Sequence, residues 1–94
     1  MKDVINRLME NGKYTIGFET TLKALKRGKV KMVLVSVNCP KEKMKAIEEA
    51  AKDVEIVTYP GTSLELGEAC GKPFPVSAIA FEDLGGISIS EIEG

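Results

Sequence analysis

The run KMVLVSV, residues 31–37, constrains the possible folds of this sequence more than any other segment. It is short, apolar and rich in β-branched residues, as is typical of a strand that is covered on both faces. Further strand-like runs occupy residues 14–16, 54–59 and 76–81. Segments with apolar residues at helical spacing alternate with them, near residues 3–10, 17–28, 40–51 and 62–71. The alternation predicts an α/β fold in which helical layers enclose a sheet.

Local signals place the ends of the second and third helices. Gly17 begins the second helix, and Gly28 ends it in the position that favours glycine after a helix. The turn that follows the 31–37 strand contains Asn38, Cys39 and Pro40, and Pro40 suits the first position of the third helix.

The last third of the chain contains a short helix and an ambiguous end. Thr62 and Glu65 have the spacing of a capping box, in which each side chain bonds the backbone of the other. Gly71 stops this helix after about two turns, and a strand follows. After two glycines, the segment ISISEI (87–92) alternates between apolar and polar residues, so we interpret it as an edge strand or a frayed tail.

Composition indicates one soluble domain that spans residues 1–94. The longest purely apolar run has four residues, which is too short to span a membrane, and the first residues lack the apolar core of a signal peptide. We therefore expect a cytoplasmic protein. Cys39 and Cys70 stand far apart, and there is no histidine, so neither a zinc site nor a disulfide is expected.

The charges are distributed unevenly along the chain. The net charge is −1, but residues 1–45 hold eleven Lys and Arg against four Asp and Glu, whereas residues 46–94 hold two against ten. Such asymmetry suggests an anionic partner on one side of the molecule. The densest basic stretch is KALKRGKVK, residues 23–31. Alternatively, this basic stretch is a solvated helix end whose lysines complement the helix dipole.

Three loops follow strands of the expected sheet, at Gly17, at Asn38 and at residues 61–63. If these strands are parallel, the loops meet at one edge of the sheet, where open α/β folds bind ligands. Two of the loops begin helices, whose free N–H groups attract anions. The alternatives are ordinary turn geometry for Gly17 and, for Asn38, a side chain that bonds its own turn.

Phe74 lies between Pro73 and Pro75, just before the last strand. Its ring reaches the same edge only if that strand is antiparallel to its neighbours, so a site that includes it requires a mixed sheet. The alternative is that Phe74 is buried over an edge of the sheet.

Signals for catalysis are weak. Neither cysteine has a histidine to act as its base, and no nucleophile-elbow, Walker or dinucleotide-binding motif occurs. We therefore expect a protein that is not an enzyme, with no catalytic residues, no metal and no cofactor.

Two long segments resemble the ribosomal protein 30e family of archaeal and eukaryotic large subunits, which belongs to a superfamily of kink-turn RNA-binding proteins. They are IGFETTLKALKRGKVKMVLVSVNCP and YPGTSLELGEACGKPFPVSAIA, and together they cover most of the chain. The motif ELGxxxGKxF points to this family rather than to its relatives. The resemblance implies a three-layer α/β/α sandwich with a mixed four-stranded sheet.

The resemblance also implies a function and a set of contacts. Members of the family bind a sharply bent internal loop of RNA with tandem G·A pairs. Gly17 and the start of its helix approach these pairs, Asn38 makes a polar contact, the 61–63 loop closes over an extruded nucleotide, and Phe74 supplies an apolar platform. The residues that we expect to contact RNA are Gly17, Phe18, Glu19, Lys23, Asn38, Gly61, Thr62, Ser63, Phe74 and Pro75.

Glu19 departs from the basic or amide residue that is frequent at this position of the family. A carboxylate suits the start of a helix but repels phosphate, although it can accept hydrogen bonds from base amino groups. The Thr62–Ser63–Leu64 loop also replaces a loop richer in asparagine.

The implied partners are ribosomal RNA and other proteins of the large subunit, with a monomer when free and no membrane. The alternatives are a guide-RNA or other ribonucleoprotein member of the superfamily, and a small α/β enzyme or nucleotide-binding module.

Overall fold

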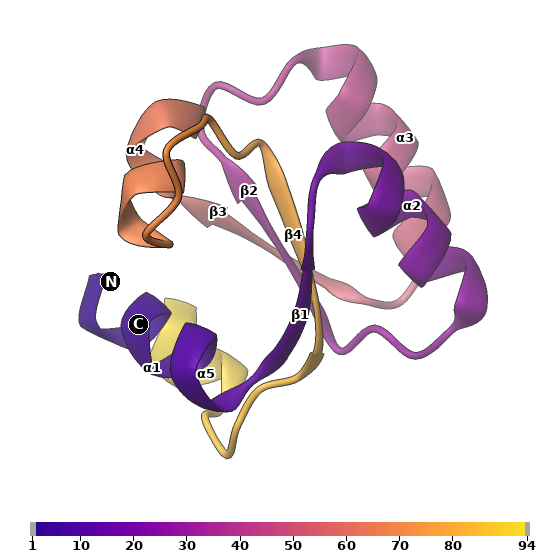
Figure 1. The fold of residues 1–94 in the computed structure, drawn as a ribbon. Coiled ribbons are helices and arrows are strands. Elements are labelled where there is room, and N and C mark those ends of the chain that lie inside the picture. The colour runs from indigo at the N-terminus through magenta and orange to yellow at the C-terminus, as the bar shows by residue number, and fades with distance from the viewer. Residues whose placement is uncertain (1, 94) are drawn as a thin grey trace.

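The computed structural model describes residues 2–93 and contains a mixed four-stranded sheet between two layers of helices (Figure 1). The elements, in chain order, are α1 (Lys2–Asn11), β1 (Lys13–Ile16), α2 (Phe18–Arg27), β2 (Met32–Ser36), α3 (Lys41–Ala51), β3 (Glu55–Tyr59), α4 (Ser63–Ala69), β4 (Ala78–Asp83) and α5 (Ile89–Glu93). The expected α/β/α architecture is therefore confirmed.

The strand order is β1-β4-β2-β3. β2 pairs in parallel with β3, while β4 is antiparallel to both β1 and β2. Three strands thus run in one direction and β4 runs against them. The mixed sheet that Phe74 required is present, because the segment before β4 arrives at the end of the sheet where β1, β2 and β3 finish.

The two faces of the sheet are covered by different helices. α2 and α3 cover one face, where Val33, Val35, Ala78 and Ala80 are buried. α1, α4 and α5 lie on the other face, as Figure 1 shows, over a cluster that includes fully buried Phe81. Neighbouring residues of β2 and β4 therefore contribute to opposite layers, which explains why residues 32–35 are all apolar.

Several predicted boundaries need correction. The last strand begins at Ala78 and ends at Asp83, two residues later than expected at each end. Pro40 precedes α3 as its N-cap residue and does not occupy the first helical position.

The prediction for residues 87–92 was wrong, because residues 89–93 form α5 and not a strand or a frayed tail. The hydroxyl of Ser88 accepts a 3.3 Å hydrogen bond from the N–H of Glu91 and so caps the turn. Ile87 and Ile92 are buried in the cluster that also holds residues of α1. A local cap and a buried face therefore outweigh the alternating pattern. No helix within residues 2–93 has the length and apolarity needed to cross a membrane.

Candidate nucleic-acid interface

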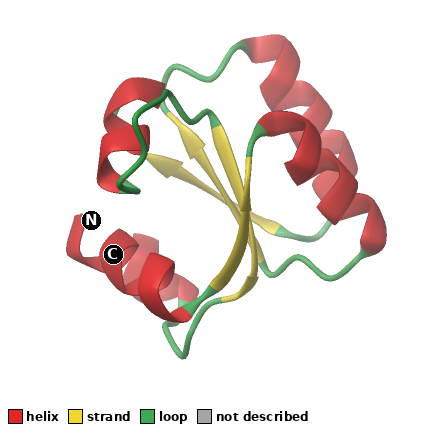
Figure 2. Cartoon of the chain, in the orientation of Figure 1, coloured by secondary structure: helices red, strands yellow, loops and turns green. Residues whose placement is uncertain are grey.

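One end of the sheet gathers the predicted site loops. We call it the loop edge and define it by Gly17, residues 37–40, residues 60–64 and residues 71–77. Figure 2 shows these connections, in green, at the end of the sheet where α2 and α3 begin. Backbone hydrogen bonds join them: the N–H of Gly17 donates to the carbonyl of Ala78 at 3.0 Å, and the N–H of Val37 donates to the carbonyl of Gly61 at 3.0 Å. The expected meeting of distant loops is confirmed.

Gly17 holds the backbone conformation that starts α2. Its φ of 115° and ψ of 151° fall in a region that essentially only glycine adopts. A Cβ at this position would lie 3.1 Å from Oγ1 of Thr20. Because glycine has no side chain to cap the helix, the first N–H groups of α2 have no side-chain acceptor from the N-cap and can attract an anion.

Asn38 joins two loops of this edge. Its Oδ1 accepts a 2.8 Å hydrogen bond from the N–H of Ser63. The alternative that Asn38 bonds its own turn is therefore wrong. Since the backbone group at Ser63 is a donor, the amide oxygen must face it, and the amide nitrogen is left to face away as a donor of two hydrogen bonds.

Thr62 and Gly61 stabilise the conformation of the 60–63 loop through contacts inside the protein. The hydroxyl of Thr62 accepts from the N–H of Glu65 at 3.2 Å, and a carboxylate oxygen of Glu65 accepts from the N–H of Thr62 at 3.0 Å. The predicted capping box is confirmed, so the Thr62 hydroxyl is already bonded within the protein. Gly61 is buried, and a Cβ there would lie 2.7 Å from the ring of Tyr59. Unlike the Thr62 hydroxyl, the hydroxyl of neighbouring Ser63 forms no hydrogen bond with another described residue.

Phe74 is exposed, so the alternative of a buried ring is wrong. Its exposed fraction is 47%, and those of Val37 and Leu64 are 61% and 55%. These three are the large apolar side chains that remain exposed within the described part of the chain. Val37 lies in the loop after β2, Leu64 in the first turn of α4 and Phe74 in the loop before β4. Among the described residues, the large apolar side chains that are exposed therefore come from segments at the loop-edge end of the sheet.

Gly67 explains how the Phe74 loop is held. A Cβ on Gly67 would collide with the carbonyl oxygen of Phe74, so the absence of a side chain lets the loop backbone pack directly on α4. The N–H of Val76 then donates to the carbonyl of Ser63 at 2.9 Å. With its backbone fixed against the helix and exposed prolines on both sides, including Pro75, the ring of Phe74 faces outward.

Sequence reasoning missed two of the three exposed apolar residues. Val37 was included in the β2 run, but the strand ends at Ser36. Leu64 lies about 200° around the axis of α4 from Leu66, which is buried, so the two side chains lie on nearly opposite sides of the helix. This spacing could have predicted that Leu64 is exposed.

Lys23 and Glu19 are the charged residues of α2 that were predicted to contact RNA. Lys23 is exposed and lines a small hollow of about 120 Å³ with Thr20, Arg27 and residues of β1 and β4. It therefore lies beside the edge strand β1 and not among the loops themselves. Glu19 is exposed in the first turn of α2.

Phe18 packs against the core between α2 and α3, and the ammonium group of Lys43 lies 5.3 Å from its ring centroid. The position of Phe18 indicates that its ring orients a cation near the start of α2. Lys43 was not among the predicted site residues, and only the fold brings it to Phe18.

The cysteines lack the properties of activated nucleophiles. Burial raises the pKa of the Cys39 thiol, although nearby Lys43 acts in the opposite direction. Burial likewise raises the pKa of Cys70 against the influence of Lys72. A raised pKa leaves less of the reactive thiolate at neutral pH. Within residues 2–93, no three His, Cys, Asp or Glu side chains are grouped closely enough to hold a metal ion.

Known proteins resemble the chain in fold and in sequence. A solved structure of a protein with unknown function from Bacillus halodurans C superposes with a TM-score of 0.77 over 89% of this chain and 85% of that one, at 20% identity, which supports the fold alone. The large ribosomal subunit protein eL30 of Archaeoglobus fulgidus is 41% identical over 83 residues, 88% of this chain and 94% of that protein. The eL30 of Methanopyrus kandleri is 43% identical over 86% of this chain and 76% of its own length. The eL30 of Oryza sativa is 36% identical over 93% of this chain and 80% of its own length.

These relatives are named as ribosomal proteins and not as enzymes, which confirms both the expected resemblance and the expected absence of an enzymatic role. Residues 1–91 match the sequence model of the family described as "Ribosomal protein L7Ae/L30e/S12e/Gadd45 family". The chain therefore belongs to this family, and within it resembles the eL30 proteins over most of its length.

Proposed function

We propose that this protein is a non-catalytic RNA-binding component of the large ribosomal subunit in the cytoplasm, and that the loop edge recognises a kink-turn. The curated relatives are large-subunit proteins, which supports the ribosomal role. In this proposal residues 1–94 act as one RNA-binding domain that is monomeric when free and that contacts neighbouring ribosomal proteins once assembled.

One observation carries the proposal. Exposed apolar side chains at Val37, Leu64 and Phe74 lie at the same edge as the open N-terminus of α2 and the free amide nitrogen of Asn38. Sequence-specific RNA recognition uses this combination, because unstacked bases rest on apolar or aromatic groups while polar groups read their edges. An ordinary soluble surface has no reason to collect its exposed apolar side chains in one place.

Each part of the edge has a separate task in this proposal. The glycine at the start of α2 lets the bent RNA approach the backbone, and Asn38 donates to a base or a phosphate. Ser63 and Leu64 cover the extruded nucleotide, and Phe74 supports a base or a ribose. Stacking of a base on an aromatic ring contributes about 1–3 kcal/mol. Lys23 and Lys43 supply the electrostatic part, so affinity falls as salt rises.

A mobility-shift assay at about 0.15 M salt tests the proposal. A kink-turn RNA with tandem G·A pairs is expected to bind below micromolar concentration. The same RNA with Watson–Crick pairs in place of the G·A pairs keeps its phosphates but cannot bend, and it is expected to bind far more weakly. Equal affinity for the two RNAs would show that the edge recognises only charge, and the kink-turn proposal would be wrong.

A further inference from the structure

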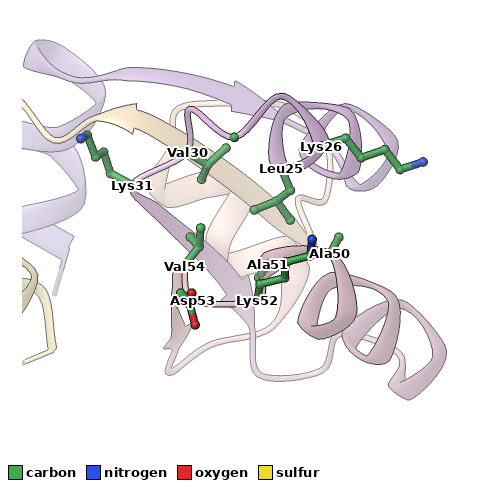
Figure 3. A pocket seen from close by; sticks show the side chains of 10 residues that line it. Leu25, Lys26, Val30, Lys31, Ala50, Ala51, Lys52, Asp53 and Val54 are labelled. Carbon is green, nitrogen blue, oxygen red and sulfur yellow. The ribbon is translucent and has the colours of Figure 1, made fainter.

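A groove of about 630 Å³ lies at the end of the sheet opposite to the loop edge. It opens between the turn that follows α2 and the turn that follows α3, where β2 and β3 begin. Figure 3 shows Leu25 and Val30 on one side, facing Ala51 and Val54 on the other. The volume falls within the range of sites that bind small molecules or short peptide segments.

Backbone hydrogen bonds fix both walls of this groove. Gly28, with a φ of 75°, donates its N–H to the carbonyl of Leu25 at 3.1 Å and so closes the α2 turn. The N–H of Val54 donates to the carbonyl of Ala51 at 2.9 Å and closes the α3 turn. The N–H of Lys31 ties the first wall to β4 through the carbonyl of Phe81 at 2.7 Å. The groove is therefore formed before any partner binds, which lowers the entropy lost on binding.

The floor of the groove is aliphatic. Leu25, Val30 and Ala51 are buried beneath it, and Ala50 and Val54 are half-buried at its surface. No aromatic ring and no side-chain amide lines it within the described residues, so it lacks the groups on which bases stack or by which their edges are read. The floor suits apolar side chains.

The rim is cationic. Lys26, Lys31 and Lys52 line the groove and are exposed, and Asp53 is the one acidic residue among the described residues that line it. None of the three lysines forms an ion pair with a carboxylate in the part of the chain that the structure describes. Unpaired cations around an apolar floor are complementary to a segment with carboxylates at its ends and aliphatic side chains at its centre.

We propose that this groove binds a short protein segment in which leucine-like side chains are flanked by Asp or Glu. A nucleic acid fits less well, since the described residues that line the groove offer no aromatic ring on which a base could stack and no side-chain amide that could read its edge. The rim lysines pair with carboxylates at its margin, while the aliphatic side chains cover the floor. The proposal concerns a protein partner and is independent of the RNA-binding role of the loop edge.

The two ends of the sheet can be occupied together. β2 separates the groove from the loop edge, and its five residues span about 16 Å. A protein neighbour at the groove and an RNA at the loop edge would therefore contact different side chains. This arrangement suits a protein that joins RNA to another protein.

A defined peptide tests the proposal. The probe is a fluorescein-labelled peptide of sequence Asp-Glu-Leu-Leu-Asp-Leu-Glu, measured by fluorescence anisotropy against the full chain. There are two matched control peptides. One carries lysine in place of each acidic residue, and the other carries serine in place of each leucine. The acidic leucine peptide is expected to bind at least about tenfold more tightly than either, because charge and apolar contact are both required. Equal binding of the three peptides would overturn the proposal.

A pair of matched variants locates the binding site. Lys26→Glu with Lys31→Glu reverses two rim charges and is expected to weaken binding of the acidic peptide by about tenfold. Lys41→Glu with Lys45→Glu makes the same change of net charge on exposed positions of α3 outside the groove, and it is expected to leave the peptide affinity unchanged. Equal losses in the two variants would show that only net charge matters and would contradict the groove assignment.

Competition decides between protein and RNA as the occupant. Kink-turn RNA is expected to bind without displacing the peptide, which would give a larger anisotropy for the ternary complex. If a plain RNA duplex displaces the peptide, and the Lys26→Glu, Lys31→Glu variant no longer binds that duplex, the groove is an RNA site and the proposal of a protein segment is wrong.

Discussion

The side-chain oxygen of Asn38 accepts a 2.8 Å hydrogen bond from the backbone N–H of Ser63, 25 positions further along the chain. This bond ties the loop after β2 to the first residue of α4. It also orients the amide so that its nitrogen faces away from the loop. One side chain thus holds two parts of the loop edge together and leaves a hydrogen-bond donor for a ligand.

These two roles of Asn38 are separable by mutation. Asn38→Asp keeps the oxygen that accepts from Ser63 but replaces the amide donor with a negative charge. We expect its free energy of unfolding to stay within about 0.5 kcal/mol of the wild type while kink-turn affinity falls. Asn38→Ala loses both groups, so the free energy of unfolding should fall by about 1 kcal/mol as well. Urea unfolding and mobility shifts measure the two effects. Wild-type RNA affinity in Asn38→Asp would show that the amide donor has no role.

Phe74 and Phe81 form a natural pair for testing exposed and buried rings. Phe74 is 47% exposed, whereas Phe81 is fully buried between β4 and the α1, α4 and α5 layer. We expect Phe74→Ala to weaken RNA binding by about 1–3 kcal/mol with little loss of stability. Phe81→Ala should lower the free energy of unfolding by about 3–5 kcal/mol. If Phe74→Ala destabilises the fold as much as Phe81→Ala does, the conclusion that the Phe74 ring faces outward is wrong.

Gly17 and Gly28 bracket α2, and both have positive φ. Gly17→Ala places a side chain in a region of backbone space that it strongly disfavours, which should cost about 1–3 kcal/mol of stability. In the proposed function the added methyl group also faces the RNA, so we expect affinity to fall further than stability explains. Gly28→Ala, where no atom lies within 4 Å of the added Cβ, should cost about 1 kcal/mol and leave kink-turn affinity unchanged. Equal RNA affinities in the two variants, measured by filter binding, would argue against close approach at Gly17.

Lys23 is expected to contribute through phosphate contact. Lys23→Ala should weaken binding of all RNAs and reduce the slope of log affinity against log salt by about 0.7–0.9, the change for one phosphate. Arg7→Ala is the control, because Arg7 belongs to α1, on the other face of the sheet from α2, and pairs with Glu91 at 3.9 Å. A salt series for both variants measures the slopes. An unchanged slope for Lys23→Ala would place Lys23 away from the phosphates.

The parts of the fold that the sequence predicts well are those set by local rules. The capping box of Thr62 and Glu65 depends on residues three positions apart, and it is present as expected. Residues 32–35 of β2 are all apolar, so burial on both faces of the sheet was the expected interpretation, and all of β2 is buried. Gly28 adopts the left-handed conformation that its position after α2 predicted.

The rest depends on contacts that are distant in the sequence. Ser88 and Glu91 have the spacing of a helix start, but the alternating isoleucines obscured it, and only packing against α1 makes the helix stable. The exposure of Val37 follows from where β2 ends, and the bond between Asn38 and Ser63 follows from the pairing of β2 with β3. The sequence predicted that the loops would meet, but not which of their polar groups would already be bonded.

The claim that the loop edge is the RNA-binding surface is tested most directly by nuclear magnetic resonance of isotope-labelled protein, with and without kink-turn RNA. We predict the largest changes at the backbone amides of Gly17, Ser63 and Phe74 and at the side-chain amide of Asn38, with Val30 and Val54 at the opposite end unchanged. The largest changes at the groove between α2 and α3, or along α1 and α5, would contradict the account.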